Sequence, residues 1–402
     1  MYCKLNENCI QFDALGVHMV GNPNSHVLFG LDEEGYDLIL RLFNGCELDI
    51  NSLGVSQLEL LNALKESGLI NDDLETEHNR TAYLHITSHC NMNCVGCYSR
   101  FTRDDHSPDV MQTDDILRIV DKLCEAKVSS IVISGGEPFL RTDIIDILRY
   151  IKNKNEIKHV SCISNGKINV RRYQQTSTYI DCLSFSLDGY SKEASFLRKE
   201  SFDNVIEAIN LLKGTYGSLE IIFTIHRKNY MYTREMAELA QILGVEHSFS
   251  LFTTAHSDET AELEISEDIL ESFIQYAIQN NMHITDTPLD RSLGCSVCCG
   301  AGRSLISISA DGEIMPCHMF YDKKFSLGNA LHDDISQIFR SRTMPFFSVD
   351  KKTKCKNCEV KYLCGGGCLF RSYLASGNLE DTDPLCPMYF QGIEDTVRML
   401  IG

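Results

Sequence analysis

The chain has 402 residues and a formal net charge of −19, with 43% hydrophobic and 23% charged residues. This composition is typical of a globular protein, and the length predicts two or three domains. A surface that follows nucleic-acid phosphates needs an excess of Lys and Arg, so the charge argues against a nucleic-acid partner. The sequence shows neither a signal peptide nor an apolar stretch long enough to span a bilayer. We therefore expect a cytoplasmic protein with no membrane partner.

Residues 1–78 predict a first, small domain. An apolar strand at 26–31 precedes helical patterns at Glu33–Phe43 and Gln57–Ser67, and a second short strand follows at 69–70. This order of a strand, two helices and a strand is typical of a winged-helix-like domain.

Residues 79–290 predict a second domain, in which strands and helices alternate. The strand-like segments are 82–87, 129–134, 158–163, 182–187, 218–226 and 246–252. The helical patterns are 114–126, 143–152, 202–213, 233–243 and 266–280. Six such units predict an α/β fold with a parallel sheet, in the form of a partial (β/α)6 TIM-like barrel. In such folds the chemistry lies at the C-terminal ends of the strands.

Cysteine is unusually frequent, with 18 residues. In a reducing cytoplasm, Cys residues in clustered spacings indicate metal binding rather than disulfides. The third predicted domain, 291–402, is rich in Cys and Gly and has few long periodic segments. We therefore expect metal ligation to stabilise it.

The first Cys group, Cys90, Cys94 and Cys97, has the spacing C-x3-C-x2-C directly after the first strand of the predicted barrel. Three thiolates on one loop can bind three irons of a [4Fe–4S] cluster and leave the fourth iron open to a ligand. A zinc site is the alternative, but it normally needs four ligands. No fourth Cys or His lies beyond Cys97 at ligand spacing, and His89 is badly placed to chelate together with the adjacent Cys90.

Glycine and polar residues follow the next strands of the predicted barrel. The second strand precedes Gly135-Gly136-Glu137-Pro138, the third precedes Ser164-Asn165-Gly166, and the fourth contains Ser186, with Arg198 further along. Two glycines let a backbone approach a ligand closely, and Glu137 can accept a hydrogen bond from an ammonium group. Ser186 and Arg198 can bind a carboxylate. Each turn also has a purely structural explanation, but their order at successive strand ends indicates a binding site.

The three-Cys loop and the GGEP turn resemble those of the radical S-adenosylmethionine (SAM) superfamily. The resemblance implies that Cys90, Cys94 and Cys97 hold a catalytic [4Fe–4S] cluster whose open iron binds the amino and carboxylate groups of SAM. It also implies that SAM is cleaved reductively, and that the 5′-deoxyadenosyl radical takes a hydrogen atom from a substrate. The SAM contacts that it assigns are Gly135, Gly136 and Glu137 for the amino group, Ser186 and Arg198 for the carboxylate, Tyr98 for the adenine and Ser164 for the ribose.

The C-terminal Cys pattern resembles the SPASM extension of peptide-modifying radical SAM enzymes, whose seven-Cys pattern is complete here. The resemblance implies two auxiliary [4Fe–4S] clusters, and so three clusters in all. The ligands that it assigns are Cys299, Cys317, Cys368 and one upstream Cys for the first auxiliary cluster, and Cys355, Cys358, Cys364 and Cys386 for the second. The upstream ligand is either Cys295 or Cys298. We expect Cys295, because the side chains of the adjacent Cys298 and Cys299 diverge. A pair of zinc knuckles is the alternative.

The N-terminal unit resembles the PqqD-like domains that recognise leader peptides in ribosomal peptide maturation. The resemblance rests on the order of elements and on the run from Phe43-Asn44-Gly45 to Leu69-Ile70. Such domains bind a leader as an added strand at an exposed sheet edge. The partners implied are a precursor peptide with a leader sequence and a flavodoxin- or ferredoxin-type electron donor. An unrelated winged helix with a packing role is the alternative.

Together these resemblances imply a radical SAM oxidoreductase that modifies a precursor peptide, by thioether or carbon–carbon crosslinking. An anaerobic sulfatase maturase, which oxidises a Cys or Ser side chain, is the alternative enzyme. Those maturases carry an Asp as proton acceptor directly after the Cys of the G-x4-C element, where this chain has His318. His318 is either a catalytic base or a polar neighbour of a metal ligand. A non-catalytic iron–sulfur carrier or peptide-binding scaffold would not need Glu137, Ser186 and Arg198 at the strand ends.

Overall fold

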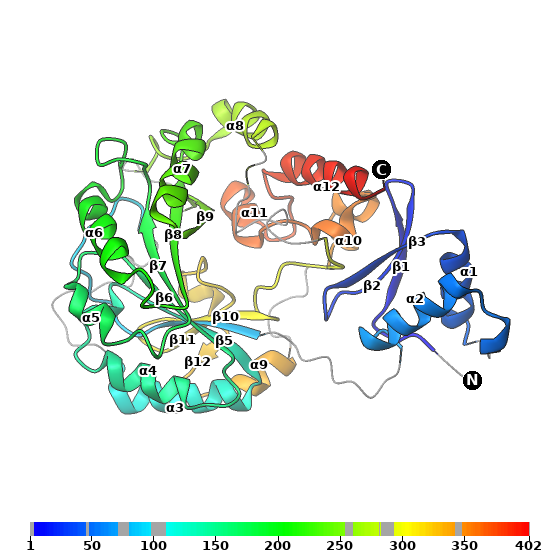
Figure 1. Ribbon diagram of the computed structural model, residues 1–402, viewed down its shortest axis with the longest axis horizontal. Coiled ribbons are helices and arrows are strands. Elements are labelled where there is room, and N and C mark those ends of the chain that lie inside the picture. Colours follow the sequence, from blue (N-terminus) through cyan, green and yellow to red (C-terminus); the bar gives the residue numbers. More distant parts are fainter. Residues whose placement is uncertain are drawn as a thin grey trace. The chain divides into compact units, whose positions relative to one another are not determined.

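The structure is a computed structural model that describes residues 4–45, 48–70, 80–97, 110–253, 260–280, 282, 293–341 and 348–401. The chain forms two compact units (Figure 1). Unit 1 comprises Met1–His78, Thr287–Cys299 and Phe347–Gly402, and unit 2 comprises Asn79–Asp286 and Gly300–Phe346. The Cys-rich region 291–402, which the sequence predicts as one domain, is thus divided between the two units.

Unit 2 is built on a nine-stranded sheet with the order β12-β11-β10-β4-β5-β6-β7-β8-β9. Its strands are β4 (Arg80–His85), β5 (Val128–Ser134), β6 (His159–Ser164), β7 (Cys182–Leu187), β8 (Ser218–Ile225), β9 (Glu246–Leu251), β10 (Leu305–Ile308), β11 (Glu313–Met315) and β12 (Gly328–Asn329). Strands β4 to β9 are parallel and adjacent in chain order. This arrangement confirms the predicted α/β class with a parallel sheet.

The sheet extends beyond the six predicted strands. Strand β10 pairs in parallel with β4, with Ile306 opposite Ala82, and β11 and β12 continue the sheet in antiparallel pairs. These three strands are too short to show a strand periodicity in the sequence, which explains why the prediction missed them. The segment that follows the predicted barrel in sequence therefore lengthens its sheet on the β4 side.

Helices alternate with the parallel strands of unit 2. They are α3 (Thr113–Glu125), α4 (Ile144–Lys152), α5 (Val170–Gln174), α6 (Phe202–Leu212), α7 (Thr233–Leu243), α8 (Glu267–Gln279) and α9 (Ile335–Ser341). Figure 1 shows α3 to α7 along the outer side of the curved sheet. Helix α4 buries Ile144, Ile147, Leu148 and Ile151, the spacing of one helix face. Because β4 to β9 are parallel, their C-terminal ends lie together at one edge of the sheet.

The N-terminal part of unit 1 is an antiparallel sheet followed by two helices. Its elements are β1 (Ile10–Ala14), β2 (Val17–Asn22), β3 (Val27–Leu31), α1 (Glu33–Phe43) and α2 (Val55–Glu66). The sequence predicted β3 and both helices, but not the hairpin of β1 and β2. Its tight turn at Leu15-Gly16 has positive φ at both residues. The observed order thus adds a hairpin before the predicted strand and two helices, and in the predicted second strand Ile70 forms an isolated antiparallel bridge with Leu5.

Both faces of β2 are buried inside unit 1. Side chains alternate along a strand, so Val20 faces the core under α1 and α2, whereas Met19 faces a second core. That second core includes residues from α10 (Lys361–Cys364) and α12 (Cys386–Ile401). The short helix α11 (Leu369–Ser376) lies between them in sequence. Within the described residues, no helix has the length and apolarity needed to cross a bilayer.

We expect Met19→Ala to destabilise the C-terminal part of unit 1 as well as its N-terminal sheet. Met19 is 4% exposed and packs in one core with Val360, Leu363, Ile393 and Val397. Truncating a buried Met to Ala typically costs about 2–4 kcal/mol of unfolding free energy, because a cavity remains. Limited proteolysis of 348–401 and urea unfolding would measure the effect. Met399→Ala is the matched control, because Met399 is 76% exposed; an equal loss in both variants would contradict the shared core.

Candidate functional site

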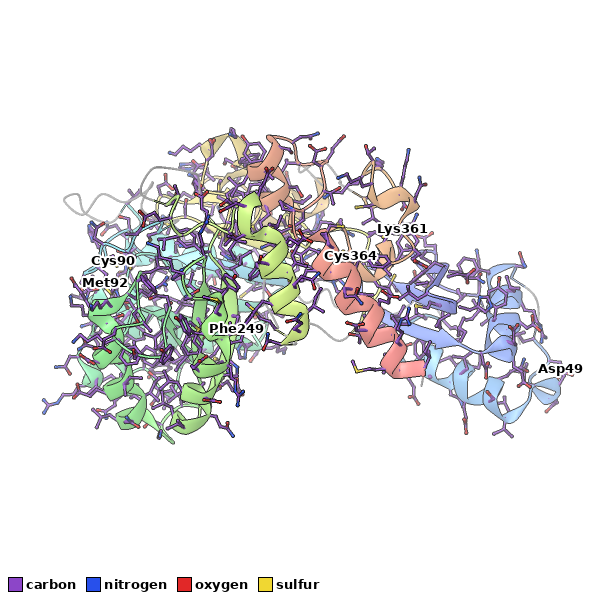
Figure 2. The ribbon with its side chains drawn as sticks, turned by 90° about the horizontal axis from the view of Figure 1, so that it is seen from above. Asp49, Cys90, Met92, Phe249, Lys361 and Cys364 are labelled. Atoms are coloured by element: carbon purple, nitrogen blue, oxygen red, sulfur yellow. The ribbon has the colours of Figure 1, made fainter. Side chains whose placement is uncertain are left out.

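The three predicted cluster ligands lie on the loop after β4. Cys90, Cys94 and Cys97 are each partly exposed, and the Cys97 amide donates to the Cys94 carbonyl oxygen at 3.4 Å. Met92 is buried and anchors the loop beside Cys90 (Figure 2). Among the described residues, no three His, Cys, Asp or Glu side chains converge on the position of a single metal ion. A cubane differs from such an ion in that each thiolate binds its own iron. Tyr98, predicted beside the adenine, lies outside the described residues.

Asn165, in the loop after β6, holds the cysteine loop on one side. Its Nδ2 donates to the Cys90 Sγ at 3.6 Å and to the Asn91 Oδ1 at 2.8 Å. Asn91 in turn donates to the carbonyl oxygen of Lys167 at 2.6 Å. The sequence placed Asn165 in a turn but did not indicate this contact with a thiol. A polar residue directly after a strand end was the only signal that could have found it.

Apolar packing holds the cysteine loop on its other side. Val95, between the second and third thiols, packs against a small core of Leu197, Phe252 and Leu263. Leu197 follows β7, Phe252 follows β9 directly, and Leu263 lies between β9 and α8. The loop is thus positioned by side chains from several strand ends of unit 2, as the chemistry of such folds requires.

The two glycines of the GGEP turn are needed because the cysteine loop itself approaches them. A side chain at Gly135 would overlap the carbonyl oxygen of Thr87, and one at Gly136 would overlap that of His89. Gly135 also has a φ of +135°, which disfavours other residues. The amide of Gly136 donates to the Thr87 carbonyl oxygen at 2.9 Å. The sequence predicted that a ligand approaches this turn closely. The close contacts that the structure describes are instead with the backbone of the cysteine loop.

Glu137 is fully buried and accepts hydrogen bonds from the chain. Its Oε1 accepts from the Phe139 amide at 3.2 Å, its Oε2 accepts from the Asn165 amide at 2.8 Å, and the Ser164 hydroxyl lies 3.0 Å from both oxygens. Burial raises the pKa of Glu137 to about 7, although these hydrogen bonds lower it. Ser164 also contacts the Tyr173 hydroxyl at 2.8 Å. The carboxylate therefore joins the GGEP turn to the end of β6.

Arg198 lies on a turn that Asp188 organises. The buried Asp188 carboxylate, just after β7, accepts hydrogen bonds from the amides of Phe196 (2.6 Å), Leu197 (2.6 Å) and Arg198 (3.0 Å). The Arg198 Nη1 donates to the Thr224 hydroxyl of β8 at 3.0 Å. These bonds fix a cation at the C-terminal ends of β7 and β8, where a carboxylate can be bound.

Two buried residues that the sequence did not indicate support Asp188. The His226 Nε2 lies 3.5 Å from the Asp188 carboxylate, and the Asn229 amide donates to the Asp188 carbonyl oxygen at 2.8 Å. Burial is the largest influence on the pKa of Asp188 and raises it. The neighbouring His226 imidazole, the Arg198 charge and the backbone amides outweigh burial, so the pKa is lowered. Ser186, half-buried in β7, precedes this carboxylate by two residues.

His318 lines a hollow at the C-terminal ends of β4, β5 and β10. Its imidazole stacks on Tyr83, with ring centroids 4.3 Å apart. The buried His85, which the sequence reasoning missed inside a strand, lines the same hollow. Burial, and to a lesser extent His318, lowers the pKa of His85 to about 3, so this imidazole is neutral at neutral pH. Because Gly135 also lines the hollow, both imidazoles lie beside the GGEP turn.

Four thiols of unit 1 lie close enough to influence one another. Burial, with smaller contributions from Cys386 and Cys355, raises the pKa of Cys364 to about 12, although hydrogen bonds from two backbone amides lower it. The pKa of Cys386 is raised by burial and by Cys355 and Cys358. These influences connect Cys386 with the other three residues assigned to the second auxiliary cluster. Neighbouring thiolates repel one another unless a metal centre binds them.

Cys368 and Cys299, assigned to the first auxiliary cluster, also interact. Burial raises the pKa of Cys368 to about 11; Arg371 lowers it and Cys299 raises it. The Cys368 amide donates to the buried Asp383 carboxylate at 2.8 Å, and Arg371 pairs with Asp383 at 3.1 Å. The Tyr389 hydroxyl completes this network with a 2.9 Å bond to Asp383. The network therefore fixes the backbone that carries Cys368.

The upstream candidate Cys295 is 0% exposed and packs against the N-terminal sheet. A Cβ at Gly21 of β2 would lie only 2.5 Å from the Cβ of Cys295. Burial, assisted by Cys9, raises the pKa of Cys295 to about 12. These described contacts do not involve the other predicted ligands. The choice between Cys295 and Cys298 stays a prediction, and Cys317 belongs to unit 2.

Comparison with protein families shows what two segments of this chain are similar to. Residues 84–240 match the model of the radical SAM superfamily, and residues 298–359 match that of SPASM, an iron–sulfur cluster-binding domain. The chain therefore contains one segment similar to the radical SAM superfamily and one similar to the SPASM domain, and these similarities indicate an enzyme. The resemblances carried by the three-Cys loop and by the C-terminal Cys pattern are therefore confirmed at the level of these two domains. Cys364, Cys368 and Cys386 lie beyond the matched SPASM residues.

Curated proteins with similar sequences carry different names. The probable GTP 3′,8-cyclase of Methanococcus maripaludis (strain DSM 14266) is 28% identical over 65% of this chain and 93% of its own length. The subtilosin biosynthesis protein AlbA of Bacillus subtilis (strain 168), named for an antilisterial bacteriocin, is 28% identical over 65% of this chain and 59% of its own length.

Two solved structures share the fold. Native anSMEcpe with bound AdoMet superposes with a TM-score of 0.63 at 18% identity, and the match covers 80% of this chain and 98% of that one. SuiB of Streptococcus suis, bound to S-adenosylmethionine, has a TM-score of 0.56 at 16% identity, with 95% of this chain and 99% of that one covered. At this identity the likeness establishes the fold alone.

The buried Glu137 should make the stability of unit 2 depend on pH. Burial raises its pKa from 4.5 to about 7, so between these values the folded chain keeps a proton that the unfolded chain has lost. Stability should therefore fall as the pH rises from 4.5 to 7, by roughly 3 kcal/mol for a shift of this size. Glu137→Gln, which cannot titrate, should remove this component.

Urea unfolding of the metal-free protein at a series of pH values measures this dependence. Glu125→Gln is the matched control, because Glu125 is exposed in the same unit. It should keep the wild-type profile. A Glu137→Gln profile parallel to that of the wild type would show that Glu137 does not titrate in this range.

Proposed function

We propose that the chain binds SAM at the open iron of a [4Fe–4S] cluster held by Cys90, Cys94 and Cys97. The observation that carries this proposal is a set of three partly exposed thiols on one anchored loop, directly beside the GGEP turn. With the cluster, SAM supplies a 5′-deoxyadenosyl radical that takes a hydrogen atom from the substrate. The residues of this chain bind and orient SAM and exclude water.

In this proposal the SAM-binding residues come from successive strand ends. Arg198, on the turn organised by Asp188, binds the carboxylate of SAM with charge-assisted hydrogen bonds, together with Ser186. Gly135, Gly136 and Glu137 form the turn that receives the amino group. Glu137 has an additional task, because its buried carboxylate ties this turn to the end of β6. Ser164 lies near the ribose and Tyr98 beside the adenine.

The proposal includes two auxiliary [4Fe–4S] clusters. Their ligands are Cys299, Cys317, Cys368 and Cys295 or Cys298 for the first, and Cys355, Cys358, Cys364 and Cys386 for the second. The mutual influence among the four thiols of the second set supports its assignment. These clusters can exchange electrons with a flavodoxin- or ferredoxin-type donor.

We further propose that the substrate is a ribosomal precursor peptide, in which the enzyme forms a thioether or carbon–carbon crosslink. Two relatives support a peptide substrate. AlbA is named for the biosynthesis of a bacteriocin, and SuiB has been solved in complex with its precursor peptide SuiA, with a TM-score of 0.53 to this chain. Residues 1–78 act as a PqqD-like leader-recognition domain, whose sheet has β1 and β3 at its edges.

A sulfatase-maturase-like oxidation of a Cys or Ser side chain is the second candidate. The hollow lined by His318 and His85 favours it, because His318 follows Cys317 at the position of the proton acceptor in those enzymes. Neutral His85 leaves His318 as the imidazole that can take a proton there. The same hollow can also hold the reacting side chain of a precursor peptide, so the product distinguishes the two candidates.

We expect Cys94→Ala to abolish SAM cleavage and to lower the iron content by about one cluster in three. The physical reason is that Cys94 is one of only three proposed ligands of its cluster, whereas the auxiliary clusters draw on other segments. Production of 5′-deoxyadenosine by dithionite-reduced protein measures cleavage. Cys124→Ala is the matched control, because Cys124 is half-buried on α3, outside all ligand sets. Wild-type cleavage by Cys94→Ala would overturn the SAM-site assignment.

Removing the leader from the precursor should raise the KM of the reaction at least about tenfold, because residues 1–78 would lose their contact with it. The peptide is truncated rather than the enzyme, since Met19 and Val360 share a core. Co-expression with short reading frames that flank the gene, followed by mass spectrometry, identifies a peptide that loses two hydrogen atoms per crosslink. An unchanged kcat/KM for the leaderless peptide would contradict leader recognition, and oxidation of a single Cys or Ser would favour the second candidate.

A further inference from the structure

Unit 1 contains a buried ammonium group at Lys352. This side chain is 2% exposed, although Lys is rarely buried unless it is paired. Its Nζ donates to the carbonyl oxygens of Gly366 at 3.1 Å and Asp381 at 3.2 Å. Its backbone carbonyl accepts from the Lys356 amide at 3.0 Å, which places Lys352 at the start of the turn that carries Cys355.

The ammonium group joins three segments that carry ligands of the second auxiliary cluster. Lys352 precedes Cys355 by three residues, Gly366 follows Cys364 by two, and Asp381 precedes Cys386 by five. The Cys355 thiol is within electrostatic range of the ammonium group. Burial raises the pKa of Cys355, and the positive charge of Lys352 lowers it in part. Cys364 is the last residue of α10 (Figure 2). The turn that carries Cys355 precedes this helix in the sequence.

Within the described part of the chain, Lys352 forms an ion pair with no carboxylate. Asp381 accepts from Lys352 through its backbone carbonyl oxygen, and no ion pair joins its carboxylate to Lys352 in the described residues. Two further acidic residues of these segments have other partners. Asp350 pairs with Lys361 at 2.8 Å, and Asp383 pairs with Arg371 at 3.1 Å. Burying a cation among carbonyl groups alone is costly, so a fold that does so indicates an anion nearby. Four thiolates outweigh the positive charge of an iron–sulfur core, so a complete cluster is such an anion.

We propose that Lys352 is the buried counter-charge of the auxiliary cluster held by Cys355, Cys358, Cys364 and Cys386, and that it raises the reduction potential of this cluster. The inference rests on the proposed cluster ligands. The reduced cluster carries one more negative charge than the oxidised cluster, so a fixed cation at short range stabilises the reduced form more. The backbone amides of Gly366 and Gly367, which interact with the Cys364 thiol, act in the same direction.

The test compares Lys352→Met with Lys351→Met in the full-length, reconstituted protein. Lys351 is exposed and adjacent, so its substitution removes the same charge where water screens it. In a redox titration followed by electron paramagnetic resonance, one component of Lys352→Met should shift to lower potential. We expect at least a tenfold smaller reduced-to-oxidised ratio at a fixed potential, which is 59 mV for one electron. Lys351→Met should titrate like the wild type.

A second readout separates a charge effect from a merely structural one. Without iron, Lys352→Met should raise the melting temperature, because it removes an uncompensated buried cation. With the cluster bound, the same substitution should reduce the stabilisation that the cluster provides. A role limited to the two carbonyl contacts would instead lower the melting temperature in both forms. Lys352→Met could take up too little iron to titrate. In that case the same redox titration is done with Lys352→Gln, which is neutral but keeps hydrogen-bond donors.

Iron counting separates the failure of this inference from that of the cofactor assignment. Wild-type protein that binds only one cluster, or Cys364→Ala protein that keeps the wild-type iron content, would overturn the proposed ligands. Two outcomes at full iron content would overturn the counter-charge alone. One is an unchanged reduction potential in Lys352→Met and Lys352→Gln, and the other is an equal shift of the potential in Lys351→Met.

Discussion

The amide of Glu137 donates to the carbonyl oxygen of His89 at 2.7 Å, one residue before the first thiol of the cysteine loop. This bond can form only because Gly135 and Gly136 leave room for the backbone that follows β4. The buried Glu137 carboxylate then binds the end of β6, where Asn165 reaches back to Cys90. The cysteine loop is thus held by a closed circuit of hydrogen bonds between three neighbouring strands. Displacing any member would move the thiols relative to the proposed SAM contacts.

Unit 1 depends on a different principle, the burial of charge beside sulfur. Lys352 and the Arg371–Asp383 pair are buried within the segments that carry the proposed auxiliary ligands. In this low-dielectric environment each charge acts on the thiols over a longer range than it would at the surface. The N-terminal sheet shares a core with Cys358 and Cys364. The N-terminal sheet and these proposed ligands therefore belong to one packed core.

Secondary structure followed from the sequence where local signals agreed. Strand β7 and helices α1 and α7 have the bounds that were predicted, and Gly244 ends α7 in a left-handed conformation, as expected for a helix terminated by glycine. Strands β1 and β2 and the short strands β10 to β12 were missed. Their two to six residues mix polar and apolar side chains, and they are specified by pairing with distant segments rather than by their own periodicity.

The sequence by itself determined which atoms are available for chemistry. Cys90, Cys94 and Cys97 stay together in any fold, because a loop this short cannot separate them. It also determined the order of strand ends at which glycine and polar residues recur. Only the tertiary structure decided which polar groups are buried and what they contact, as for Asn165 on the cysteine loop and Lys352 between three ligand-bearing segments. The physical reason is that burial and hydrogen bonding depend on contacts between residues far apart in the chain, which spacing along the sequence does not encode.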